Sequence, residues 1–183
     1  IVVISYFATP YRWRWALLLT ASYYFYMCWK PSYVVILMII TLADYLLGIK
    51  IGKAASLKAR RFYLALSLAF NIGFLFYFKY TDFFLASLND VMACTESDFR
   101  SPLLNILLPV GISFHVFQSL SYTFDVYWNR RPAETHLGYY ALYVAYFPQL
   151  VAGPIERSTN LLPQLHEKYS FDYNRVVSGL LLM

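Results

Sequence analysis

Charged residues are scarce in this sequence, where lysine, arginine, aspartate and glutamate make up 14% of 183 residues. A typical soluble domain carries about 25%, so this chain has too little charge to coat a soluble surface. Its many apolar residues also exclude a disordered chain. Cysteine is scarce too, because only Cys28 and Cys94 occur and they lie at no metal-ligand spacing. This excludes a disulfide framework and a cysteine-based zinc site.

Long apolar blocks dominate what is present. Hydrophobic residues make up 60% of the chain and aromatic residues 20%. A helix needs about 20 apolar residues to cross a bilayer, and about 17 suffice. The blocks cover residues 15–29, 33–49, 62–78, 103–127 and 137–155. We therefore predict an all-α fold, a polytopic transmembrane helical bundle.

Apolar residues also stand at the two ends, in residues 1–8 and 176–183. We expect both ends to lie within membrane segments. Residues 1–183 would then form one portion of a longer multi-pass membrane domain, cut at both ends.

The charges lie at the ends of the apolar blocks, which is where membrane topology uses them. The net charge of +5 therefore indicates no nucleic-acid partner. Residues 50–61 contain five bases and no acid, whereas 79–102 contain four acids and two bases. Because basic loops prefer the cytoplasm, we predict that loop 50–61 is cytoplasmic and loop 79–102 extracytoplasmic. Residues 80–88 are candidates for a segment that lies along the membrane interface.

The apolar block 103–127 is broken at Pro109, Val110 and Gly111, and it carries a polar stripe after this break. On a helix from Ile112 to Tyr127, His115, Gln118, Tyr122 and Asp125 fall on one face, and Phe117, Leu120 and Phe124 on the other. Lipid cannot satisfy a polar stripe, so it should face protein or a water-filled cavity. It is either the wall of a reaction chamber or a set of interhelical hydrogen bonds, and spacing alone does not distinguish these.

Two residues of this stripe have further interpretations. Asp125 lies near the basic end of the block and is expected to pair with Arg130 or Arg131. His115 is tempting as a general base, but a lone histidine in an apolar helix is more often structural. His136 and His166 lie in polar stretches and are expected to be solvated. No two histidines have metal-ligand spacing, so no metal site is predicted.

Two other features interrupt the apolar pattern. Asp44 lies about 9 Å along a helix from the basic loop, so it should face the bundle and find a donor. We favour a structural role for it, in which the helix packs against its neighbours through Asp44, Tyr45 and Gly48. Pro148, Gly153 and Pro154 break the last block, since proline removes a donor and ends a helix. Residues 147–156 are either a re-entrant element near a substrate path or a helix end at the interface.

Two blocks of the sequence carry a family resemblance. Residues 108–127, LPVGISFHVFQSLSYTFDVY, resemble the signature helix of the membrane-bound O-acyltransferase family, and 147–155, FPQLVAGPI, resemble its second conserved block. Residues 44–48, DYLLG, and 78–80, FKY, fit as well. The likeness is greatest to the bacterial branch that O-acetylates alginate, and it covers nearly the whole chain as the N-terminal portion of the family's membrane domain.

The resemblance implies a function. It implies O-acetyl transfer from an acyl thioester, such as acetyl-CoA, to an extracytoplasmic polysaccharide such as alginate, with no bound cofactor. It also implies the bacterial inner membrane and an extracytoplasmic acyltransferase partner. The family's catalytic histidine lies downstream of this chain, so His115 does not inherit that role. A structural or chamber-lining role is implied for Gln118, Tyr122, Gln149, Gly153 and Pro154.

Two other function classes fit the residues. A multi-pass transporter or channel subunit also uses intramembrane polar stripes and broken helices. Such proteins often contain inverted repeats, and none is evident in the sequence. A membrane subunit without chemistry of its own is the third interpretation.

Overall fold

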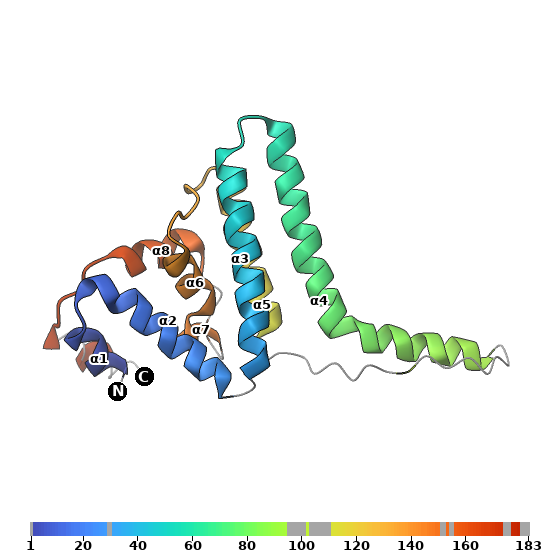
Figure 1. Cartoon of the computed structure of the whole chain (residues 1–183), viewed down its shortest axis with the longest axis horizontal. Helices are drawn as coiled ribbons and strands as arrows, with labels where there is room; N and C mark the ends of the chain where they lie inside the picture. Colours follow the sequence, from blue (N-terminus) through green and yellow to red (C-terminus); the bar gives the residue numbers. More distant parts are fainter. Residues whose placement is uncertain are drawn as a thin grey trace.

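The computed structural model describes residues 2–28, 31–94, 102, 111–150, 153, 156–173 and 177–179. Within these residues the chain is helical and contains no strand, which confirms the all-α prediction. The helices are α1 (Val2–Ala8), α2 (Tyr11–Met27), α3 (Pro31–Lys53), α4 (Leu57–Cys94), α5 (Ile112–Tyr127), α6 (Leu137–Ala145), α7 (Phe147–Leu150) and α8 (Ser158–His166) (Figure 1).

Helices α3 and α4 form a hairpin, and both are long and apolar enough to cross a membrane. Pro31 opens α3, where its missing N–H costs nothing. The turn between the helices contains only residues 54–56, and Ser56 Oγ accepts a hydrogen bond from Ala59 N at 3.2 Å. The expected basic loop 50–61 is thus mostly the ends of two helices. Its bases surround the tip of the hairpin.

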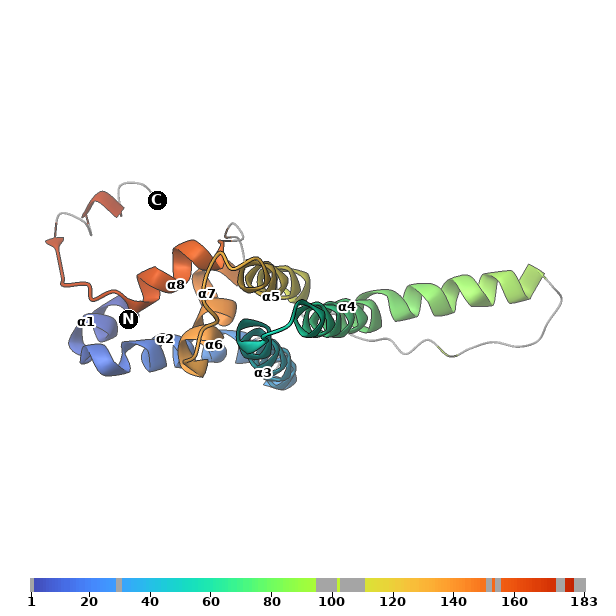
Figure 2. The same ribbon diagram turned by 90° about the horizontal axis from the view of Figure 1, so that it is seen from above.

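The prediction for the end of α4 was wrong. The apolar block was expected to stop at Lys79, but α4 continues to Cys94. Residues 80–92 contain no proline or glycine, so one lysine is not enough to end the helix. Figure 1 shows α4 bending near its middle, and Figure 2 shows its second part extending away from the other helices. Much of the expected polar loop 79–102 is therefore helix, and residues 95–101 lie outside the described part.

Helix α5 begins after a break, as the sequence predicts. Gly111 has a φ of 77°, a left-handed conformation that favours glycine, and it directly precedes α5. Pro109 and Val110, the other residues of the expected break, lie outside the described residues. Helix α5 packs against α3, α4, α6 and α8.

The last apolar block is divided into two helices. The first, α6, ends at Ala145. Tyr146 leaves the helical conformation with a ψ of 107°, and α7 follows from Phe147. Because Pro148 is the second residue of α7, it lies in a helical first turn, where proline is tolerated. The expected interruption of residues 137–155 is confirmed, although it begins at Tyr146, before the proline.

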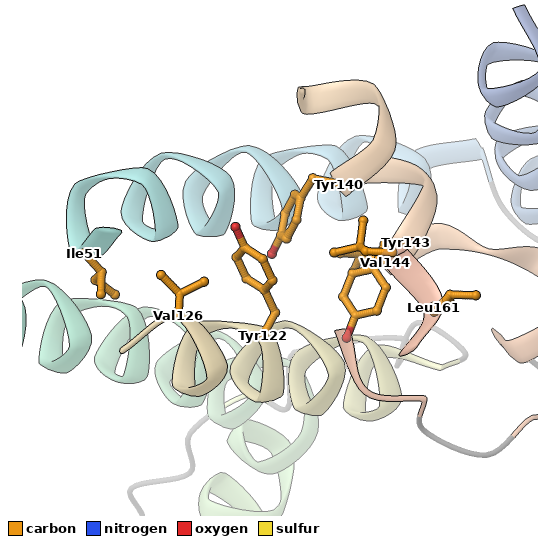
Figure 3. Packing of buried hydrophobic residues seen from close by; sticks show 8 residues of the cluster. Ile51, Tyr122, Val126, Tyr140, Tyr143, Val144 and Leu161 are labelled. Atoms are coloured by element: carbon orange, nitrogen blue, oxygen red, sulfur yellow. The ribbon is translucent and has the colours of Figure 1, made fainter. Parts of the chain in front are cut away.

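The core lies where α3, α5 and α6 meet. Tyr122 of α5 and Tyr140 and Tyr143 of α6 are fully buried there, together with Ile51 and Val126 (Figure 3). The rings of Tyr122 and Tyr140 lie 4.7 Å apart between centroids. These large side chains fill the space between the helices.

Candidate functional site

The polar stripe of α5 faces the protein interior. His115, Gln118 and Tyr122 are fully buried, and Asp125 is nearly so, whereas Phe117 is 54% exposed. The opposite face is not uniformly open, because Leu120 is buried against α4 in a cluster with Val116. Helix α5 is therefore covered on most of its circumference, and only a narrow strip around Phe117 is open.

Gln118 joins α5 to the broken end of α6. Its Nε2 donates to the carbonyl oxygen of Tyr143 at 2.8 Å and lies 3.4 Å from Gln149 Oε1. The last four carbonyls of a helix have no partner within that helix, and Tyr143 is in the last turn of α6. Gln118 thus satisfies a carbonyl that the break leaves open. It also brings together two of the residues that the sequence singles out, Gln118 and Gln149.

Tyr122 fixes the distance between α3 and α5. Its hydroxyl accepts a hydrogen bond from Glu134 N at 2.9 Å. Its ring lies against Gly48 of α3, where an added Cβ would come within 2.8 Å of Tyr122 Cε1. The expected packing of α3 through Gly48 is confirmed, and Tyr122 is the side chain that requires it.

Asp125 has two partners near the end of α5. Ser158 Oγ of α8 donates to its Oδ2 at 2.8 Å, and Arg130 Nη1 lies 3.8 Å from its Oδ1. The expected pairing with Arg130 or Arg131 is therefore met by Arg130. Arg131 instead pairs with Glu134 at 3.9 Å and donates to the carbonyl of Ser158.

Asp44 is fully buried between helices. Its Oδ1 accepts hydrogen bonds from Asn71 Nδ2 at 2.7 Å and from Ser67 Oγ at 3.0 Å, both on α4. The expectation that Asp44 faces the bundle and finds donors is confirmed. The donors themselves were missed, although the sequence contains a signal: Ser67 and Asn71 are spaced i, i+4 in an otherwise apolar block.

The segment after α7 is held by backbone contacts. Gly153 N donates to the carbonyl of Gln149 at 3.0 Å, and a Cβ at Gly153 would come within 2.6 Å of Gln149 Cα. Only glycine fits this approach without a shift of the backbone. Pro154 lies outside the described residues. A role of these residues in lining a substrate path stays a prediction.

His166 has a partner that sequence analysis did not find. Its Nε2 lies 3.0 Å from Glu134 Oε2, and its ring lies 3.9 Å from that of Tyr139 between centroids. Both His166 and His136 are exposed, as expected, and His136 Nδ1 accepts a hydrogen bond from Tyr139 N at the start of α6. Among the described residues no cluster of histidine, cysteine and carboxylate residues could hold a metal ion.

A pocket of about 660 Å³ lies apart from the polar stripe. Aromatic and aliphatic side chains of α1, α2, α6, α7 and α8 line it, with Arg14 among them and Pro148 at its α7 side. Arg14 is held there by the carbonyl oxygens of Thr9 and Tyr169, at 3.1 and 2.7 Å. Sequence analysis missed this pocket, since its walls come from residues far apart in the chain. The lining does not include His115, Gln118 or Tyr122.

Comparison with known proteins finds relatives over nearly the whole chain. It is 37% identical to a probable alginate O-acetylase of Pseudomonas putida, covering 96% of this chain and 38% of the relative. It is 39% identical to the protein of the same description from Azotobacter vinelandii, covering 91% of this chain and 34% of the relative. A peptidoglycan O-acetyltransferase of Helicobacter pylori is 31% identical over 90% of this chain and 35% of the relative.

These relatives confirm the resemblance to O-acetylases of the membrane-bound O-acyltransferase type. The chain spans a little over a third of the length of the relatives. No protein-family profile and no solved structure matches it. With α3 and α4 long and apolar enough to span a bilayer, the chain is a membrane protein.

Proposed function

From the similarity to membrane O-acetylases, we propose that this chain is part of a membrane-bound O-acetyltransferase that modifies an extracytoplasmic polysaccharide of the alginate type. The observation that carries the proposal is the similarity itself, because it extends over 91–96% of the chain in the two alginate O-acetylases described above. It also favours acyl transfer over the transporter or channel alternative. The expected donor is an acyl thioester such as acetyl-CoA.

The described helices supply a scaffold for this chemistry. Acyl transfer to a hydroxyl needs a base for the hydroxyl proton and donors for the oxyanion that develops. It also needs a passage from which water is excluded, so that the thioester is not hydrolysed. Asp44, Gln118 and Asp125 make hydrogen bonds between helices, and Tyr122 accepts one from Glu134 in the segment before α6. They hold the wall in place, and we assign the base to the family's downstream histidine.

The proposed topology follows from the charges. Arg60 of α4 donates to the carbonyl oxygens of Val126 and Tyr127 at 3.0 and 2.6 Å, so the tip of the α3–α4 hairpin lies beside the end of α5. The bases of 50–61 and Arg130–Arg131 thus gather at one end of the bundle. We place this end in the cytoplasm of a bacterial inner membrane and the second part of α4 on the outer side. An extracytoplasmic acyltransferase partner would then receive the acetyl group on the side of the polymer.

The main test uses the intact protein in an alginate-producing bacterium from which its own O-acetylase gene has been deleted. We expect acetyl esters to reappear on the secreted polymer, measured as acetyl groups per uronate residue by NMR. Secreted polymer without acetyl esters, while the protein is present in the membrane, would contradict an alginate-directed activity. If acetyl esters are found on peptidoglycan and not on alginate, peptidoglycan is the acceptor.

His115→Phe tests the role of the buried histidine. Loss of a general base typically costs about 100-fold or more in rate, whereas we expect this variant to keep most of its acetyl-transfer rate. The reason is that His115 is fully enclosed by the helices and lies in no pocket described above. A matched variant of the downstream intramembrane histidine should abolish transfer. Equal loss in both would show that His115 takes part in the chemistry.

A further inference from the structure

The second part of α4, residues 79–92, extends away from the other helices (Figure 2). Helix α4 contains 38 residues. At a rise of about 1.5 Å per residue, a straight helix of this length would measure about 57 Å, roughly twice the thickness of the hydrocarbon core of a bilayer. Residues 57–78 alone measure about 33 Å and suffice to cross that core. The second part must therefore lie at the surface of the membrane or in water.

The large apolar side chains of this second part are exposed and share one face. At about 100° per residue they fall within an arc of about 140°, and they are Tyr80, Phe83, Phe84, Leu88 and Val91, each 39–64% exposed. The opposite side of the helix carries polar residues, namely Lys79, Asp82, Asn89 and Asp90. Such a division into an apolar and a polar face is typical of a helix that lies in the plane of a membrane interface.

Ser87 is a polar residue within the apolar arc, and it is satisfied inside the helix. Its Oγ donates to the carbonyl oxygen of Phe83 at 2.9 Å. The hydroxyl at the edge of the arc, Thr81 Oγ1, likewise donates to the carbonyl oxygen of Tyr77 at 2.7 Å. Because neither hydroxyl donor needs water, this face can enter an apolar surrounding at little cost.

The bend of α4 directs the apolar arc. In a straight helix, residues 76 and 84 would lie about 12 Å apart along the axis, yet the rings of Phe76 and Phe84 lie 5.0 Å apart between centroids. The ring of Tyr80, midway between them, lies 6.0 Å from that of Phe76. These rings therefore lie on the inner side of the bend that Figure 1 shows. When the first part of α4 crosses the membrane, the inner side of this bend faces the bilayer.

We propose that residues 79–92 bind the lipid bilayer surface, lying in the plane of the membrane with the apolar arc inserted among the acyl chains and the polar side in water. The segment contains one base and two acids, so it has no net attraction to anionic lipids. The binding is therefore apolar, and the partner is the bilayer itself. In the topology proposed above this is the outer leaflet. The proposal depends on membrane crossing by α3 and α4 and not on acetyl transfer.

The test is spin-label accessibility in the full-length protein, with its own cysteines replaced by serine, in nanodiscs of uncharged phosphatidylcholine. Single labels are placed by Phe84→Cys and Val91→Cys on the apolar arc and by Asp90→Cys on the polar side. Collision with oxygen, which concentrates in hydrocarbon, is compared with collision with a water-soluble nickel chelate. We expect the oxygen-to-nickel ratio to be several-fold higher on the apolar arc than at Asp90→Cys. Ile72→Cys, on the exposed side of the membrane-crossing part, gives the reference for lipid contact.

Two results would overturn the proposal. Equal and frequent collision with nickel at Phe84→Cys and Asp90→Cys would mean that the segment projects into water. Labels on the apolar arc that collide with neither reagent would mean that protein covers this face. If Phe84→Cys or Val91→Cys does not fold, Phe83→Cys and Leu88→Cys supply the same comparison. Because acetyl transfer is not measured here, failure of this proposal and failure of the proposed function are distinguishable.

Discussion

Helices α3 and α4 both meet the requirements for crossing a membrane, but they are embedded very differently. In the most apolar window of α3, 39% of the residues are buried inside the protein, against 11% in that of α4. Helix α3 packs against α2, α4, α5 and α6, whereas the main contacts of α4 are with α3 and α5. Hydropathy alone therefore identifies a span but does not say whether it is central or peripheral.

The two helices also use their polar residues differently. Helix α3 contributes Asp44, and α4 contributes the donors Ser67 and Asn71 on its single buried face. The other face of α4 presents large apolar side chains, among them Phe62, Ile72 and Phe76. This face is suited to lipid or to other membrane helices. The contrast between the two helices yields three predictions, ordered by the size of the expected effect.

The largest effect is expected from a bulky residue at Gly48 of α3. Gly48→Leu would force the helix away from the Tyr122 ring, which a Cβ approaches to 2.8 Å. Overpacking of this kind costs about 1–3 kcal/mol or more, so we expect a large loss of folded protein. The measurement is the monodisperse fraction in size-exclusion chromatography after extraction in detergent.

Gly73 of α4 provides the matched control, since nothing lies within 4 Å of a Cβ added there. Gly73→Leu should leave the monodisperse fraction unchanged. Equal losses in the two variants would mean that α4 is as enclosed as α3.

An intermediate effect is expected on the buried face of α4. Asn71→Ala removes the closer of the two donors to Asp44. Asp44 Oδ1 then keeps only the hydrogen bond from Ser67. The loss of one buried hydrogen bond typically costs about 0.5–1.5 kcal/mol, and about 1.5–3 kcal/mol when one partner is charged, so the midpoint of thermal unfolding should fall. The adjacent residue gives the control, because Ile72 is 55% exposed and Ile72→Ala should change the midpoint little. A midpoint unaffected by Asn71→Ala would argue that the Asp44 network does not hold α4 in place.

The smallest effect is expected on the outer face of α4. Phe76→Ala removes a side chain that is 47% exposed, and exposed substitutions usually change stability by less than about 0.5 kcal/mol. The unfolding midpoint of the full-length protein in detergent checks this. A large decrease would show that further helices of the intact protein cover this face. Helix α4 would then be peripheral within residues 1–183 but enclosed in the full-length protein.

Much of the fold follows from the sequence. The apolar block 33–49 predicts α3 closely, because a long uninterrupted apolar run at membrane length permits little except a helix. The 100° periodicity places His115, Gln118 and Tyr122 together on the buried face of α5. Gly48 and Asp44 on α3 were also placed correctly in the interior.

Other features depend on contacts between distant segments. Lys79 was expected to end a helix, but helix formation depends on all the neighbouring residues, and these permit α4 to continue. The pairing of Glu134 with His166 joins residues 32 apart in the chain and depends on how α8 packs. The pocket that α1, α2, α6, α7 and α8 line also depends on tertiary structure. Its lining residues come from distant segments, so no single stretch of sequence predicts it.

Arg60 carries a consequence for how this protein assembles. Its guanidinium holds two carbonyls at the end of α5 and the side chain of Asn129, which is synthesised 69 residues later. Because the hairpin of α3 and α4 precedes α5 in the chain, we expect the hairpin to enter the membrane before α5. Arg60 would then set the depth at which the later helix comes to rest, and the early hairpin would fix the register of the helix with the polar stripe.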